Sequence, residues 1–301
     1  MAWRIVYLSE VDKLALNLNN LKIAKGDLEV KIPLSDIFAI VIEDLTTTIT
    51  SRLMIELSKY NILVVFCNQQ HLPECMVHPI NGHFNQYGQM KEQLQWSEQN
   101  KGELWKHILV QKIQNQIQCM KHVGVLDERI NKMKQLQTLV TSRDEMNIEG
   151  QAAKYYFNTF FEDFRRDDEF LIENMVLNFG YTILNSAIAR TIVAKGLIPA
   201  LGIHHIGARN HFNLASDIIE VFRPLVDLYL LKHPPEEEYM TKAYRLELVN
   251  LMHARVRIDG KQHTVIRAVE IMVQSIIEYF RTGRYETLKL PNIKQYSFYE
   301  S

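Results

Sequence analysis

The 301-residue sequence has few cysteines, no surplus of charge of one sign and no long uninterrupted apolar run. Its three cysteines form no Cys-x-x-Cys pair and leave one without a mate, which favours a reducing compartment, so we expect a cytoplasmic protein. Lys and Arg number 34 against 35 Asp and Glu, which gives a net charge of −1. The chain therefore has no overall positive field to attract nucleic acid, and a polyanion would have to bind at a local patch.

The missing apolar run also argues against a membrane protein. The most hydrophobic helical region, 171–197, contains polar and charged residues such as Glu173 and Arg190. These interruptions are typical of a buried helix in a water-soluble fold, and we expect no contact with a membrane. The first residues include an acid at Glu10 and no apolar core, so we expect no secretory signal.

The first third of the sequence predicts β structure. Short segments such as "LALNL" and "LEVKI" alternate between apolar and polar residues, whereas "IFAIVI" and "ILVVF" are continuous apolar runs typical of strands covered on both faces. Between these runs, "TSRLMIELSKYN" has a helical stripe, with Thr50 as a possible N-cap. We expect residues 1–67 to form an antiparallel sheet with one strand–helix–strand unit.

The composition changes after Cys67, where 67–89 is polar and rich in His, Pro and Gly, as in a linker or an irregular hairpin. From Trp96 onward the spacing of apolar residues predicts helices, and an Asp-Gly pair within "RVRIDGKQHTV" predicts a hairpin. We therefore predict an α+β protein with a β-rich domain at 1–74, a linker at 75–95, a helical domain at 96–290 that includes one hairpin, and a tail at 291–301. The expected helices lie near 98–122, 125–141, 149–165, 169–195, 213–231 and 240–253, with a last one after the hairpin.

Histidines cluster in "LGIHHIGARNHFNLASDIIE" at 201–220. His204 and His205 lie between glycines, which predicts a loop or extended bend. Since neighbouring side chains of extended backbone point to opposite sides, one of the two can face a given site. The other reading is that they are surface or capping histidines.

Two acids follow in the same stretch. Asp217 and Glu220 are three residues apart and would share one face of a helix capped by Asn213. Pro224 would kink or end this helix. Such acids can equally form the solvated edge of a helix.

A third candidate acid is Glu149, in the first turn of a helix that Asn147 could cap. Small residues beside it, Gly150, Ala152 and Ala153, would allow another segment to approach closely. A helix-start acid with no chemical role has the same pattern.

Other metal sites are conceivable. Five residues of the polar segment, Cys67, His71, Cys75, His78 and His83, could supply zinc ligands, although their spacing is loose. A zinc hydrolase that uses the cluster of His204, His205 and His211 is an alternative function, and a non-catalytic helical scaffold is another.

Basic residues are in local excess over 241–284, where eight oppose four acids. The hairpin places Arg255 and Arg257 on one strand face, where they could contact DNA phosphates. Arg245 and Arg267 are further candidates for such contacts. Simple solubility explains a surplus of this kind equally well.

Taken together, four stretches resemble one family, the CRISPR-associated adaptation integrases. They are "IPLSDIFAIVIED" with the following "ITSRLMIELSKYNILVVFCN", "EGQAAKYYF" at 149–157, "NFGYTILNSAIARTIVAKGLIPALGIHH" at 178–205, and "FNLASDIIEVFRPLVD" at 212–227. The resemblance implies a metal-dependent endonuclease and integrase that joins the 3′-hydroxyl ends of new spacer DNA to the repeat array by transesterification. It also implies a homodimer with an N-terminal β domain for dimerisation and a C-terminal helical catalytic domain. The partners it implies are double-stranded DNA and a small adaptation protein whose dimer bridges two homodimers.

The resemblance carries over residue by residue. The family's first acid matches Glu149, its histidine three residues after a glycine matches His205, and its last acid before Phe-Arg-Pro matches Glu220. These three are implied to be the catalytic ligands of Mg²⁺ or Mn²⁺. Asp217 matches an aspartate that often precedes the last acid, and His204 would be the ligand if the bend is shifted by one residue.

Overall fold

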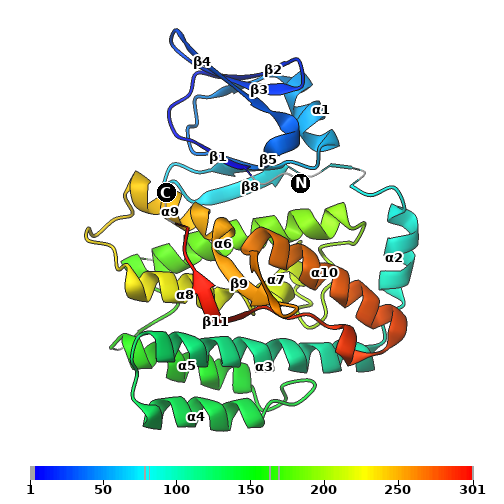
Figure 1. Cartoon of the computed structure of the whole chain (residues 1–301), viewed down its shortest axis with the longest axis vertical. Coiled ribbons are helices and arrows are strands. Elements are labelled where there is room, and N and C mark those ends of the chain that lie inside the picture. Colours follow the sequence, from blue (N-terminus) through cyan, green and yellow to red (C-terminus); the bar gives the residue numbers. More distant parts are fainter. Residues whose placement is uncertain (1–3, 78, 81, 163, 169, 300–301) are drawn as a thin grey trace. The chain divides into compact units, whose positions relative to one another are not determined.

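The computed structural model describes residues 4–77, 79–80, 82–162, 164–168 and 170–299. The chain divides into two compact units. Unit 1 comprises Met1–Met90 and Ala189–Leu197, and unit 2 comprises Lys91–Ile188 and Ile198–Ser301. The predicted α+β class is confirmed: strands predominate toward the N-terminus, and helices with a small antiparallel sheet predominate in the rest (Figure 1).

Unit 1 contains two four-stranded sheets and helix α1 (Ser51–Lys59). The first sheet has the order β1-β5-β7-β8. Its strands are β1 (Arg4–Leu8), β5 (Ile37–Ile42), β7 (Leu63–Cys67) and β8 (Pro73–Val77). β1, β5 and β7 are parallel, and β8 is antiparallel to β7. The prediction of a single antiparallel sheet was therefore wrong: a helix between two apolar strands returns the chain in parallel.

The second sheet of unit 1 has the order β4-β3-β2-β6. Its strands are β2 (Lys13–Asn17), β3 (Asn20–Lys25), β4 (Leu28–Pro33) and β6 (Thr48–Ile49), with a 3₁₀ turn at Leu34–Asp36. Apolar residues from both sheets and α1 form one core, for example Leu14, Ile40 and Leu53. Thr50 caps α1 as predicted, because its hydroxyl accepts from the Leu53 amide at 3.3 Å. The linker predicted at 75–95 contains the end of β8 and helix α2 (Gln86–Leu94).

Unit 2 is mainly helical, and most of its helices begin or end close to the predicted bounds. They are α3 (Glu98–His122), α4 (Asp127–Thr138), α5 (Ile148–Phe160), α6 (Ile172–Ala194, whose last turns belong to unit 1), α7 (Asn213–Ile219), α8 (Arg223–Lys232), α9 (Lys242–Asn250) and α10 (Val265–Thr282). Short 3₁₀ turns lie at Leu251–His253 and Tyr285–Thr287. The predicted Asp-Gly hairpin joins β9 (Arg255–Ile258) to β10 (Lys261–Thr264), and β11 (Asn292–Ser297) completes a sheet of order β10-β9-β11.

Helix α3 organises unit 2. It packs against α4, α5, α8 and β11, and Figure 1 shows α3, α4 and α5 side by side. Asn115, which is 0% exposed, donates to the carbonyls of Val221 (2.8 Å) and Pro291 (3.1 Å). A buried amide with both bonds satisfied ties the segment between α7 and α8 to the middle of α3. Among the described residues, no helix is long and apolar enough to cross a membrane.

Candidate active site

Asp217 and Glu220 are interior residues and do not form a solvated helix edge. Asp217 is 0% exposed and Glu220 is 2% exposed. The single helix predicted over 213–231 is two helices, because Pro224, which has no backbone N–H to donate, occupies the first turn of α8. Glu220 lies at the break between them, as the C-cap of α7. The break lets the Glu220 carboxylate face α3.

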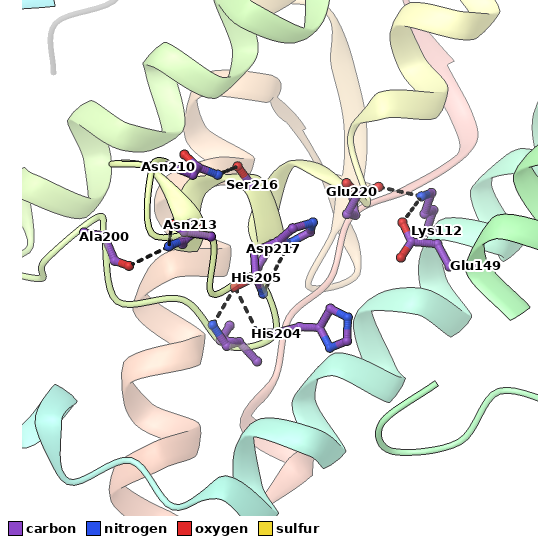
Figure 2. Close-up of polar contacts among 12 residues, drawn as sticks. Lys112, Glu149, Ala200, His204, His205, Asn210, Asn213, Ser216, Asp217 and Glu220 are labelled. Atoms are coloured by element: carbon purple, nitrogen blue, oxygen red, sulfur yellow. Dashed lines mark hydrogen bonds and ion pairs between the residues drawn. The ribbon is translucent and has the colours of Figure 1, made fainter. Parts of the chain in front are cut away.

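Asp217 holds the loop that carries the histidines (Figure 2). Its carboxylate accepts from the backbone N–H groups of Ile203 (2.5 Å), His204 (3.2 Å) and His205 (3.0 Å). A fourth contact joins its Oδ1 to Nδ1 of His205 at 2.7 Å. The loop fits tightly here, because a Cβ at Gly202 would lie 2.2 Å from the His205 carbonyl oxygen. Four contacts with one buried aspartate therefore help to hold the predicted loop.

Asn213 supports the same loop, so its predicted role as a helix cap was wrong. Its amide nitrogen donates to the carbonyls of Ala200 and Gly207, both at 3.1 Å. Phe212 occupies the N-cap position of α7 without a side-chain cap. The Asn213 side chain therefore links two points of the loop and does not cap the helix.

The two adjacent histidines have different surroundings. The His204 ring stacks on Trp105, with ring centroids 4.2 Å apart and an interplanar angle of 3°. The His205 ring meets the edge of Trp105 and bonds Asp217. The hydrogen bond between its Nδ1 and Asp217 is the main cause of a raised pKa at His205. The charges of Asp217, Glu220 and Glu149 also raise this pKa, against the opposing effect of partial burial. His205 is therefore the histidine that contacts Asp217 directly.

Glu149 reaches the same region from the start of α5. Asn147 caps this helix as predicted, because its side-chain oxygen accepts from the Gly150 amide at 3.2 Å. Asp144 adds a second cap by accepting from the amides of Ile148 (2.8 Å) and Glu149 (3.0 Å). Two caps on one helix end give Glu149 a well-defined position.

Lys112 on α3 joins the two glutamates. Its Nζ lies 2.7 Å from Oε1 of Glu149 and 2.6 Å from Oε2 of Glu220. Figure 2 marks both contacts with dashed lines. Arg223 approaches the other oxygen of Glu220, with Nε 3.1 Å from Oε1. Burial alone would raise the pKa of Glu220, but Lys112 and Arg223 outweigh burial and lower it, so this carboxylate is ionised. Burial alone would lower the pKa of Lys112, and the two glutamates reverse that effect and raise it.

A cavity of about 820 Å³ opens beside this cluster. Its wall includes the cluster members Lys112, Glu149 and Arg223. Further basic residues of the wall are Lys154, Arg165 and Arg166. Aromatic side chains also line it, namely Phe157, Phe164 and Tyr181. We call this cavity the cationic pocket, because its five basic side chains oppose two acids, Glu149 and Asp227.

The donor set of the site fits a hard divalent cation. Glu149 and Glu220 supply carboxylate oxygens, and Oε2 of Glu220 has no hydrogen-bond partner among the described residues. Since Nδ1 of His205 faces Asp217, its Nε2 is the ring nitrogen that can bind a ligand, and such carboxylate–histidine pairs are typical of metal sites. Within the described ranges, no three His, Cys, Asp or Glu side chains are already grouped as metal ligands. The Lys112 ammonium lies between the two carboxylates.

Asp227 forms a second buried acidic position beside the pocket. It accepts a hydrogen bond from the Tyr181 hydroxyl and is 3% exposed. Burial raises its pKa to about 7, despite the opposing effects of the Tyr181 hydroxyl, Arg223 and Lys112. The native pKa therefore exceeds the value of about 3.9 in an unfolded chain. Between about pH 4 and pH 7 the native state holds this proton more tightly, so Asp227 makes the protein less stable as the pH rises through this window.

Replacing Asp227 by asparagine is expected to remove this pH dependence. The free energy of unfolding of Asp227→Asn relative to wild type should rise by about 1.4 kcal/mol per pH unit between about pH 5 and pH 7, and level off above. Urea denaturation at several pH values measures this difference. As a control, Asp259→Asn changes an exposed turn residue whose positive φ suits asparagine equally well, and it should leave the slope unchanged. Parallel curves for wild type and Asp227→Asn would contradict the interpretation.

The four arginines predicted to contact DNA differ in their exposure to solvent. Arg245 is only 8% exposed, and its Nη1 donates to the Met240 carbonyl at 2.5 Å, so it is not available on the surface. Arg255 and Arg257 are exposed on one face of β9, as predicted. Arg267 is also exposed and forms an ion pair with Glu270.

The described residues give no support to the proposed zinc sites. His71 lies 3.2 Å from Glu43, Cys67 is buried and Cys75 is exposed, while His78 lies outside the described residues. No metal cluster occurs among the described members of this segment or among the His204, His205 and His211 set.

Sequence reasoning missed Lys112, Arg223 and Trp105. A signal for Lys112 was present: it follows Trp105 and Leu109 on one helical stripe, where a lysine is buried only if it is paired. Nothing local in the sequence identifies its partners, which are 37 and 108 residues away.

Comparison with known proteins identifies the chain. The family model for CRISPR associated protein Cas1 matches residues 6–244. The CRISPR-associated endonuclease Cas1 of Neisseria meningitidis serogroup C (strain 8013) is 34% identical over 305 residues, which cover 99% of this chain and 100% of that protein. Another CRISPR-associated endonuclease Cas1, from Francisella tularensis subsp. novicida (strain U112), is 28% identical over 212 residues, or 64% of this chain and 61% of that protein.

Solved structures share the fold at low sequence identity. A CAS1 protein from Thermotoga maritima has a TM-score of 0.73 at 18% identity, covering 93% of this chain and 97% of its own. A casposase bound to integration product has a TM-score of 0.71 at 18% identity, covering 99% and 95%. The Cas6-RT-Cas1–Cas2 complex contains a chain with a TM-score of 0.75 at 22% identity, covering 96% of this chain and 37% of that one.

These matches define the class of the protein as a CRISPR-associated endonuclease. The chain belongs to the Cas1 family, and the predicted function as an endonuclease and integrase of spacer acquisition is confirmed.

Proposed function

We propose that Glu149, His205 and Glu220 form the catalytic centre and hold Mg²⁺ or Mn²⁺. The observation that carries the proposal is the convergence of two glutamates from distant segments on a single cation position, beside a histidine that Asp217 orients. Two carboxylates and one imidazole suit these ions and leave positions for water and substrate. When bound, the ion polarises the target phosphodiester and lowers the pKa of the attacking 3′-hydroxyl.

The residues of the chain supply the positioning. Asp217 fixes the His205 ring through Nδ1, and the capped start of α5 fixes Glu149. The cationic pocket beside the glutamates would hold the phosphates of a DNA end, and its aromatic wall would stack on unpaired bases. A 3′-hydroxyl placed there attacks the repeat backbone and displaces the 3′-oxygen of the target strand. When water takes the place of the hydroxyl, the same centre hydrolyses DNA.

Double-stranded DNA and protein partners complete the proposal. A chain with a net charge of −1 has little intrinsic affinity for DNA, so we propose a homodimer, with two homodimers bridged by a small partner dimer that pools their basic surfaces. Among the similar folds, one chain belongs to a Cas6-RT-Cas1–Cas2 complex and another is a casposase bound to integration product, which supports a protein partner and DNA for this chain. On this chain, Arg255, Arg257 and Arg267 are the proposed contacts to the DNA backbone.

A strand-transfer assay with histidine variants tests the assigned ligands. A labelled DNA duplex is joined to a supercoiled plasmid that carries a repeat array, with Mn²⁺ or Mg²⁺ and with or without the small partner. His205→Ala should lose at least about a hundredfold in rate, because it removes a ligand and its oriented nitrogen. His204→Ala is the matched control, since its ring stacks on Trp105, and it should retain activity within about fivefold.

The reverse result, with His204→Ala inactive and His205→Ala active, would show that the other histidine is the ligand. If folded wild-type protein neither joins nor cuts DNA with either metal, the proposed centre is wrong.

A further inference from the structure

Lys112 contacts both the carboxylates proposed to bind the metal and the cationic pocket proposed to bind DNA. Its Nζ contacts the carboxylates of Glu149 and Glu220, and the same side chain lines the cationic pocket. The residue is 7% exposed and lies in the middle of α3, whose position Asn115 fixes one turn later. A single ammonium is therefore shared between the oxygens proposed for the metal and the cavity proposed for DNA phosphates.

Lys112 forms a short ion pair with each carboxylate. Its Nζ donates a hydrogen bond to Oε1 of Glu149 at 2.7 Å and lies 2.6 Å from Oε2 of Glu220. Both contacts join full charges, so a cation that binds these two oxygens must displace the ammonium from them.

The local charges are already balanced. Glu149 and Glu220 carry two negative charges, and Lys112 with Arg223 supplies two positive ones within 3.1 Å. A divalent ion that uses both carboxylates must therefore compete with the Lys112 ammonium. In a buried site such competition is strong, because solvent screens it weakly.

We infer that Lys112 couples divalent-metal binding to the binding of DNA phosphate. Without DNA, its ammonium competes for the two carboxylates and weakens metal binding. Phosphate in the cationic pocket offers the ammonium an alternative anion and frees the carboxylates. Because such coupling is reciprocal, bound metal also strengthens phosphate binding. The inference rests on the proposed metal ligands and makes Lys112 a positioning residue that favours metal binding once DNA is bound.

Manganese binding to the full chain tests this coupling directly. The affinity for Mn²⁺ is measured by electron paramagnetic resonance of the free ion, with and without a short single-stranded DNA oligonucleotide. Without DNA, Lys112→Met should bind Mn²⁺ at least about tenfold more tightly than wild type, because the competing charge is gone. DNA should tighten Mn²⁺ binding to wild type severalfold and should leave the affinity of Lys112→Met unchanged.

Three further variants test whether the effect comes from the charge of Lys112, from a folding defect, or from any positive charge in the cationic pocket. Lys112→Gln keeps a polar side chain if the methionine variant is poorly folded, and it should bind Mn²⁺ as tightly as Lys112→Met. Lys112→Arg keeps the charge and should retain the weaker affinity of wild type. Lys154→Met removes one positive charge from an exposed position on the same pocket wall, and it should weaken DNA binding without tightening Mn²⁺ binding in the absence of DNA.

The outcomes distinguish this inference from the proposed function. If wild type binds Mn²⁺, Glu149→Gln abolishes this binding, and neither neutral Lys112 variant tightens it, the coupling is wrong while the ligand assignment stands. The coupling is equally overturned if DNA tightens Mn²⁺ binding to Lys112→Met as much as to wild type. If wild type binds no Mn²⁺ even with DNA, both the ligand assignment and the coupling fail.

Discussion

Replacing Glu220 by glutamine is expected to reduce strand transfer by at least about a thousandfold, which corresponds to about 4 kcal/mol of transition-state stabilisation. Glutamine keeps the shape of the side chain but removes the charge, which is ionised in the native state because Lys112 and Arg223 lower the pKa of Glu220. A neutral amide is a poor ligand for Mg²⁺ or Mn²⁺. The rate of joining a labelled duplex to a plasmid with a repeat array measures the loss.

Glu236→Gln is the matched control for this variant. Glu236 is an exposed glutamate in the segment between α8 and α9, so the same chemical change there should leave the rate within about twofold of wild type. Circular dichroism should show that both variants are folded. A folded Glu220→Gln protein that joins DNA at the wild-type rate would remove Glu220 from the catalytic centre.

Replacing Asp217 by asparagine should reduce both activity and stability. The aspartate oxygens accept from three backbone N–H groups and from the His205 ring, and an asparagine NH₂ would face two of these donors. Because the position is 0% exposed, we expect a loss of about 2–4 kcal/mol in the free energy of unfolding. Since the histidine loses its orientation, the strand-transfer rate should fall by about ten- to a hundredfold.

Urea denaturation and the plasmid-joining assay measure the two effects of Asp217→Asn. Asp127→Asn, an exposed change in the first turn of α4, is the control and should alter neither quantity substantially. Unchanged stability in Asp217→Asn would mean that the bonds to the loop contribute little. If Asp217→Asn joins DNA at the wild-type rate and also binds Mn²⁺ with wild-type affinity in the paramagnetic resonance experiment, Asp217 does not orient His205.

Local patterns in the sequence were sufficient for much of the fold. The long helix at 98–122, the Asp-Gly hairpin and the caps at Thr50 and Asn147 depend on neighbours within a few residues, and the structure has them where they were predicted. Strand direction was mispredicted, because the pairing of β1 with β5 joins segments more than thirty residues apart and leaves no local trace.

The same division holds for the site. Residue types and motif order were enough to single out Glu149, His205 and Glu220 as candidates, and the family comparisons agree with the function that these motifs implied. The sequence left the role of Asp217 open, and the predicted role of Asn213 as a helix cap was wrong. A buried side chain forms hydrogen bonds with whichever backbone groups the fold places beside it. No local pattern specifies such groups.

The sequence by itself determined the fold class, most helices, the family and a short set of acids and histidines, since these follow from periodicity, capping and motif spacing. Tertiary structure alone decided that Lys112 lies between Glu149 and Glu220, that His205 rather than His204 contacts Asp217, and that Arg245 is buried. The physical reason is that charge pairing, burial and ring stacking depend on distances that the packing of the whole domain sets, and no short stretch of sequence specifies them.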